Sequence, residues 1–214
     1  MTDDAHNNST IDDQFGDALE CYQKGQINAA YVICMAILSQ EQEHAASLHL
    51  LGLILCQTGD LQDAISRLEA AVKADNGNAD FWNSLGVISQ TGGFFDKAQH
   101  AFEQAILCRN DFAEANNNLG TLFYARGIFV DALGAFKQAI KYRPAYANAH
   151  YNLATTLQTL GQREECLEAY MHLLYIDPGH AAGFFGLGQA LVDLGQTSAA
   201  AMAFEHLISS IPQP

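Results

Sequence analysis

The chain has 214 residues, of which 49% are hydrophobic, and a formal net charge of −14 from 24 acidic and 10 basic side chains. Nucleic acids and anionic membranes are bound through clustered Lys and Arg, so this charge argues against both as partners. The sequence has neither a basic-then-apolar leader nor an apolar run long enough to span a bilayer, so we expect a cytoplasmic protein.

Residues 1–10 are polar and show no hydrophobic period, which predicts a disordered tail. From residue 11 onward, one glycine recurs at a fixed spacing of 34 residues: Gly25, Gly59, Gly93, Gly127, Gly161, Gly195. Such self-similarity is the signature of a repeat architecture. We therefore predict one solenoid over residues 11–214, built from the repeats 11–44, 45–78, 79–112, 113–146, 147–180, 181–214.

Each repeat is predicted to be two antiparallel helices joined by a tight turn. In residues 113–146, apolar side chains recur every three or four positions on both sides of Gly127, which is the helical period. A glycine just past a helix favours a left-handed C-terminal cap. Pro144 ends the second apolar stretch because proline cannot continue a helix, and Pro178 and Pro212 do the same in the last two repeats.

Two slots in each repeat hold small residues. The first-helix slot contains Ala18, Gly52, Gly86, Gly120, Ala154, Gly188, and the second-helix slot contains Ala30, Ala64, Ala98, Ala132, Cys166, Ala200. Because helices approach closely only where side chains are small, we expect these two series to face each other. The last predicted helix, from about Thr197 to Ser210, has Glu205 as its only formal charge.

This unit resembles the tetratricopeptide repeat. Residues 79–112 match the pattern most fully, through Trp82, Leu85, Gly86, Gly93, Phe95, Ala98, Phe102, Ala105. The resemblance covers residues 11–214 and implies an all-α, right-handed α-α superhelix of six helix-turn-helix units. In such stacks the first helices line the concave face. The resemblance also implies protein binding in place of catalysis.

The sequence gives little sign of a catalytic or metal site. Five cysteines are present without a C-x-x-C pair, and the eight histidines are scattered, with no H-E-x-x-H motif. Apolar helix slots hold most of these cysteines, which favours a packing role in a reducing compartment over a redox or metal role. We expect no cofactor, no metal and no enzymatic activity.

Function is instead expected on the concave face. The candidate peptide-binding residues are Asn83, Ser84, Asn117, Asn118, Thr121, Tyr124, Asn148, Tyr151, Asn152, Thr155, Phe185. An asparagine amide both donates and accepts, so Asn118 and Asn152 can pair with a peptide backbone of any sequence. This pair resembles the asparagine ladder in the repeats of O-linked N-acetylglucosamine transferase. The alternative is that the polar residues are only solvated and the aromatic ones only packed against a neighbouring repeat.

The charges on this face favour a neutral or basic ligand. Tetratricopeptide domains that bind the acidic tails of heat-shock chaperones use Lys, Arg and Asn on the concave face. None of the ten Lys and Arg residues of this chain falls in the concave slots, whereas Asp80, Glu114 and Asp193 do. An acidic partner is therefore the less favoured class.

Three functions follow from the sequence. The first is a scaffold that binds an extended peptide or a partner helix in its groove. The second is the substrate-recognition region of a longer glycosyltransferase- or methyltransferase-type enzyme. The third is a self-assembling oligomer, because the last helix would expose Met202 and Ile208 on an apolar surface.

Overall fold

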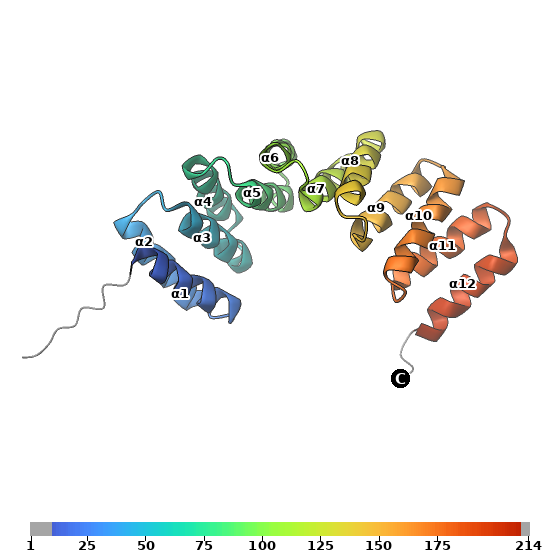
Figure 1. The fold of residues 1–214 in the computed structure, drawn as a ribbon, viewed down its shortest axis with the longest axis horizontal. Helices are drawn as coiled ribbons and strands as arrows, with labels where there is room; N and C mark the ends of the chain where they lie inside the picture. The colour runs from blue at the N-terminus through green and yellow to red at the C-terminus, as the bar shows by residue number, and fades with distance from the viewer. Residues whose placement is uncertain (1–9, 211–214) are drawn as a thin grey trace, which may run out of the picture. The chain divides into compact units, whose positions relative to one another are not determined.

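The computed structural model describes residues 10–210, and its regular structure there is helical throughout. The helices are α1 (Ile11–Gln23), α2 (Ile27–Gln40), α3 (Ala45–Thr58), α4 (Leu61–Ala74), α5 (Ala79–Thr91), α6 (Phe95–Cys108), α7 (Ala113–Ala125), α8 (Phe129–Tyr142), α9 (Ala147–Thr159), α10 (Arg163–Ile176), α11 (Ala181–Asp193) and α12 (Thr197–Ser210) (Figure 1). The predicted all-α class of paired helices is confirmed. Among residues 10–210, no helix is both long and apolar enough to cross a membrane.

The helices form two compact units, one ending at Cys108 and one starting at Arg109. The first unit contains α1 to α6 and the second contains α7 to α12. A single uninterrupted solenoid over residues 11–214 stays a prediction. Of the predicted tail, only Thr10 is described, and Pro212 also lies outside the described residues.

The chain enters α1 through a capping box at Thr10. The Asp13 amide donates to Thr10 Oγ1 at 3.1 Å, and the Thr10 amide donates to an Asp13 carboxylate oxygen at 3.0 Å. These bonds satisfy backbone donors that an isolated helix start leaves unpaired. Because the carboxylate accepts hydrogen bonds from the Thr10 hydroxyl, at 2.8 Å, and from the Thr10 amide, the pKa of Asp13 is lowered.

The periodic glycines lie in the turns between the paired helices. All six have positive φ, from 72° at Gly161 to 91° at Gly59. A side chain in this left-handed region would clash with the backbone, and glycine has none. This conformational requirement explains why the glycine series keeps its period.

The first-helix glycines let large side chains pack against the backbone. A Cβ built on Gly86 would lie 2.5 Å from the Phe102 ring, and one on Gly120 would lie 2.6 Å from the Phe136 ring. Those rings are buried at 0% and 1% exposure. At Gly86 and Gly120 the nearest atoms therefore belong to these rings, whereas at Gly52 they belong to Leu68 and to the carbonyl of Ala64, a member of the predicted facing series.

Successive repeats contact each other mainly through the second helix of one repeat and the first helix of the next, as α8 contacts α9, and neighbouring first helices also touch. In the first unit α3 contacts both α1 and α5, and in the second unit α9 contacts both α7 and α11. The second helices of successive repeats come less close within each unit. Each unit therefore has a continuous wall of first helices, with wider spaces between its second helices.

Candidate functional site

We use the term "first-helix wall" for the surface that α7, α9 and α11 form in the second unit, where most of the candidate residues lie. Because the repeats stack in one register, residues 34 positions apart form rows across these helices. The four rows are Asn117, Tyr151, Phe185; Asn118, Asn152, Gly186; Thr121, Thr155, Gln189; and Tyr124, Gln158, Val192.

Side-chain hydrogen bonds join α7 to α9 across these rows. Asn152 Nδ2 donates to Asn117 Oδ1 at 3.0 Å, and the hydroxyl oxygens of Tyr124 and Thr159 lie 3.2 Å apart. Asn117 is only 7% exposed. The structure therefore gives Asn117 a place inside the wall, where its amide holds Asn152 in position.

The other candidates in this unit reach the surface to different degrees. Thr121, Tyr124, Asn148 and Phe185 are exposed, whereas Asn118, Tyr151, Asn152 and Thr155 are half-buried. Tyr151 packs against neighbouring rings, with centroid separations of 5.1 Å to His180 and 6.4 Å to Tyr170. Phe185 lies 6.1 Å from Phe204 but keeps 49% of its surface exposed.

The threonines of the wall present acceptors to solvent. Thr121 Oγ1 donates to the Asn117 carbonyl and Thr155 Oγ1 to the Asn152 carbonyl, each at 3.0 Å. A hydroxyl has one hydrogen and two lone pairs. Because the hydrogen is used within the helix, each oxygen keeps its lone pairs as acceptors.

The acidic residues of the concave slots differ in their pairing. Arg143, in the turn between α8 and α9, forms a salt bridge with Glu114 at the start of α7. Its guanidinium also lies 5.0 Å from the centre of the Tyr146 ring. Asp193 is exposed at the end of α11, where it lines a hollow of about 290 Å³ with Gln158 and Gln189. Within the described second unit, Asp193 therefore favours a basic ligand more than Glu114 does.

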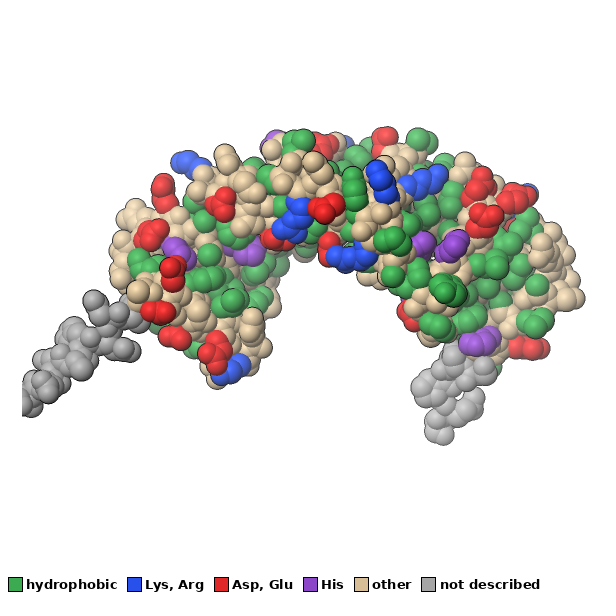
Figure 2. All heavy atoms as spheres, in the orientation of Figure 1, with side chains coloured by type: hydrophobic (Ala, Val, Ile, Leu, Met, Phe, Trp, Pro, Cys, Tyr) green, Lys and Arg blue, Asp and Glu red, His purple; other side chains and the backbone are tan. Residues whose placement is uncertain are grey.

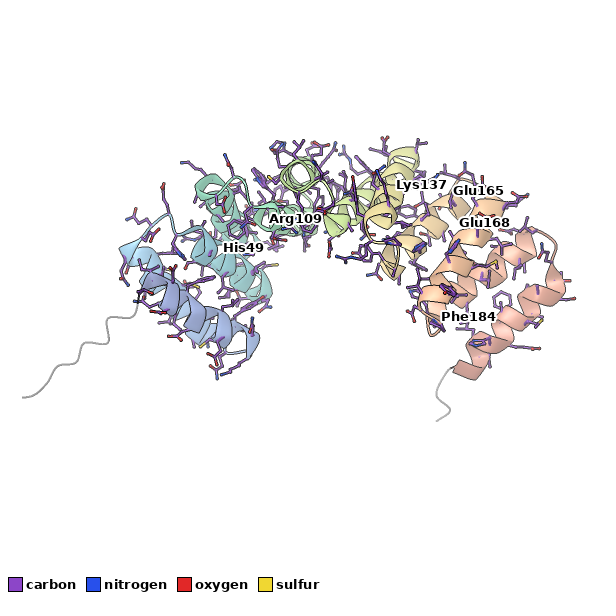
Figure 3. All side chains as sticks on the ribbon, in the orientation of Figure 1. His49, Arg109, Lys137, Glu165, Glu168 and Phe184 are labelled. Atoms are coloured by element: carbon purple, nitrogen blue, oxygen red, sulfur yellow. The ribbon has the colours of Figure 1, made fainter. Side chains whose placement is uncertain are left out.

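The first unit holds the remaining two candidates, Asn83 and Ser84, both half-buried on α5. Ser84 Oγ lies 2.8 Å from Nε2 of His49 on α3, and the His49 ring stacks on Phe81 with a centroid separation of 4.6 Å. His49 is labelled on α3 in Figure 3. Burial lowers the pKa of His49 to about 4, and the nearby charge of Asp80 opposes this shift only in part. The imidazole is therefore neutral at pH 7.

Sequence reasoning missed an apolar row in the first unit. Leu19 and Val87 are 39% and 41% exposed, and Leu53 between them is half-buried. They occupy the repeat slot that holds Thr121, Thr155 and Gln189 in the second unit. Comparing slots along the chain would have revealed this change from apolar to polar residues.

Comparison with known proteins places the fold. No curated protein sequence matches the chain significantly. Three similar solved structures are pilF of Pseudomonas aeruginosa (TM-score 0.82, 15% identity, covering 95% of this chain and 93% of that one), MamA (0.71, 24%, 75% and 94%) and YrrB (0.69, 20%, 84% and 92%). YrrB is described as a TPR protein with an unusual peptide-binding site. At sequence identities of no more than 24%, this structural similarity shows that the chains share a fold and nothing further.

Matches to family models show which protein family the chain belongs to. Tetratricopeptide repeat models match residues 41–89, 90–137, 147–180 and 181–214, and a further TPR repeat model matches residues 120–161. These matches together extend from residue 41 to residue 214. The matches to residues 147–180 and 181–214 begin at the first residues of α9 and α11, so each starts where a helix pair starts. The chain belongs to the tetratricopeptide repeat family.

Proposed function

We propose that the chain is a non-enzymatic scaffold that binds an extended peptide along the first-helix wall. The observation that carries this proposal is the set of acceptors on α7 and α9. The hydroxyls of Thr121 and Thr155 have already donated their hydrogens, and the Asn152 amide is held by Asn117. Backbone N–H groups of an extended peptide are the donors that match such a surface.

Pre-organisation strengthens this interaction. The bond between Asn152 and Asn117 fixes the Asn152 side chain before a ligand arrives, so less rotamer entropy is lost on binding. Each net hydrogen bond to a peptide contributes about 0.5–1.5 kcal/mol. Asn118, in the same row, would extend the contact in the manner of the asparagine ladder that the sequence resembles.

Exposed rings on the same wall supply apolar anchors. Tyr124 is 37% exposed and Phe185 is 49% exposed, and they lie on α7 and α11 respectively. Aromatic residues dominate binding energies at interfaces when they are buried by the partner. Together with Asp193, they favour a ligand that combines apolar and neutral or basic side chains.

Replacing Asn118 and Asn152 together with alanine tests the mechanism. Peptides selected from a random dodecapeptide display library on the wild-type chain would be measured by fluorescence anisotropy. We expect the double variant to weaken binding about tenfold or more, because two amides that pair with the peptide backbone are lost. N-methylation of single peptide bonds in the ligand should cause similar losses.

Gln138→Ala provides the matched control, because Gln138 is an exposed amide on the second helix α8. This variant should bind as the wild type does. Unchanged affinity in the double asparagine variant, with unchanged helical content by circular dichroism, would contradict binding at the wall.

Self-association is a second candidate function, and one feature favours it. On α12, Met202 is 71% exposed and Ile208 is 62% exposed. Exposed apolar side chains contribute to contacts between copies when they form a patch.

A further inference from the structure

A cavity of about 770 Å³ lies between the second helices α8 and α10. Its lining from α9 includes His150, Leu153 and Leu157, and α10 contributes Glu165, Glu168 and Tyr175. Lys137 lies on the α8 side; Figure 3 labels it together with Glu165 and Glu168. The cavity is therefore separate from the candidate residues of the first-helix wall and lies wholly within the second unit.

The repeat pattern explains the space. His150 occupies the slot that holds Trp82 in repeat 79–112. Trp82 Nε1 donates to the Asn76 carbonyl at 2.9 Å, and His150 Nε2 forms the same bond to the Pro144 carbonyl at 2.9 Å. The imidazole keeps this bond but is smaller than an indole. Since His150 lines the cavity, an indole at this position would occupy part of it.

The imidazole also leaves a polar group unsatisfied. His150 is 7% exposed, and its Nδ1 has no hydrogen-bond partner among the described residues. Nε2 carries the hydrogen because it faces a carbonyl oxygen, so Nδ1 is an acceptor. Burial lowers the pKa of His150, which keeps the ring neutral. Buried acceptors without a partner are uncommon in native proteins.

The surroundings of the cavity indicate what kind of ligand fits. Glu165 and Glu168 form no ion pair with any described residue, and acidic side chains lie beside hydrophobic ones over α10 in Figure 2. Next to the cavity, a hollow of about 380 Å³ is lined by Glu168, Met171, His172 and Tyr175. Tyr175 is 86% exposed and Met171 is 58% exposed. The surface thus combines exposed apolar side chains with unpaired carboxylates.

We propose that this groove between α8 and α10 is a second protein-binding site. Its occupant is a partner segment that inserts a bulky apolar side chain over Leu153 and Leu157 and places Arg or Lys against Glu165 and Glu168. The volume lies within the range of about 300–1,000 Å³ that ligand pockets occupy. An arginine suits the rim best, because it stacks on a tyrosine ring and pairs with a carboxylate at the same time.

His150→Trp tests the proposal by filling the cavity. A random dodecapeptide display library would be depleted on this variant and then selected on the wild-type chain. We expect the selected peptides to carry an aromatic or large aliphatic residue near Arg or Lys. Their affinity, measured by fluorescence anisotropy, should fall about tenfold or more in His150→Trp. Circular dichroism and thermal unfolding establish that the variant is folded.

If the indole of His150→Trp disturbs the fold, Glu168→Arg provides a second test, because Glu168 is exposed and not part of the buried core. Glu164→Arg is its matched control: it makes the same charge change on the same helix, at an exposed position outside the cavity lining. We expect Glu168→Arg to weaken the selected peptides several-fold more than Glu164→Arg does. Replacing Asn118 and Asn152 with alanine should leave these peptides unaffected, which separates this site from the wall.

Three results would overturn the proposal. The first is that no peptide is enriched after depletion. The second is that the enriched peptides are acidic or lack an apolar anchor. The third is that Glu164→Arg and Glu168→Arg weaken binding equally, which would mean that the peptides respond only to net charge.

Discussion

At the scale of single residues, His49 shows how the contact between α3 and α5 depends on a neutral side chain. The ring stacks on Phe81 and its Nε2 lies 2.8 Å from Ser84 Oγ, so α3 and α5 are joined through an uncharged imidazole. Protonation would place a charge in a site with little access to water. The pKa of His49 is accordingly about 4, against 6.5 for a solvated histidine.

This shift predicts a pH dependence of stability. As the pH falls from about 6.5 to about 4, the unfolded chain gains a proton at position 49 that the folded chain resists, so stability is lost over that window. The loss from this group is about 2–3 kcal/mol. Chemical denaturation at several pH values should show a smaller loss in His49→Phe, which cannot titrate. Equal losses in both proteins would contradict a buried neutral imidazole.

At the scale of elements, the tight approach of paired helices depends on glycine in the first helix. Replacing Gly120 with alanine places a Cβ 2.6 Å from the Phe136 ring, which must then move within a packed core. Overpacking of this kind costs about 1–3 kcal/mol. Gly134→Ala is the matched control, because Gly134 is exposed on α8 and has no atom within 4 Å of the built Cβ. That change should stabilise α8 by about 0.5–1 kcal/mol.

Urea denaturation followed by circular dichroism separates these two outcomes. The midpoint should fall for Gly120→Ala and rise or stay constant for Gly134→Ala. If the two variants unfolded at the same urea concentration, the close contact between Gly120 and Phe136 would not limit the packing of α7 on α8.

The helices themselves were largely predictable, whereas their cross-connections were not. The period of Gly127 and its equivalents gives the turns, and the last helix was expected from about Thr197 to Ser210, as it is found. Alignment by repeat places Asn118 beside Asn152, one period apart. In the structure the Asn152 amide donates to Asn117, at a separation of 35 residues. A repeat period of 34 residues does not predict that bond.

The cavity beside His150 was missed for a different reason. Its sequence signal is the replacement of the tryptophan found at Trp82 by a smaller ring in the equivalent slot. This substitution indicates a cavity only if no other side chain fills the volume that the tryptophan would occupy. Whether that volume is filled depends on the neighbouring side chains, whose positions follow from packing in three dimensions.

At the scale of the whole molecule, the question is whether copies of the chain associate. The net charge of −14 opposes association between copies, and the exposed Met202 and Ile208 of α12 favour it. We expect the apolar contact to dominate at high salt, where charge repulsion is screened. Sedimentation velocity over a range of concentrations should then show a dimer or larger species.

The double variant Met202→Glu, Ile208→Glu should sediment as a monomer under the same conditions. Val130→Glu is the control, because Val130 is an apolar residue with 74% exposure on α8. A wild-type chain that stays monomeric at every concentration would rule out self-association through α12.

The offset of the hydrogen bonds between first helices has a consequence for how such a chain changes in evolution. Both units use the same separation of 35 residues, between His49 and Ser84 in the first and between Asn117 and Asn152 in the second. That separation is one complete repeat plus one residue. Gain or loss of a whole repeat therefore preserves the register in which these bonds form, whereas insertion of a single residue between the bonded partners breaks it. The number of repeats can thus change with the stacking register kept, and the two bonds themselves persist wherever the added or lost repeat lies outside the bonded pair.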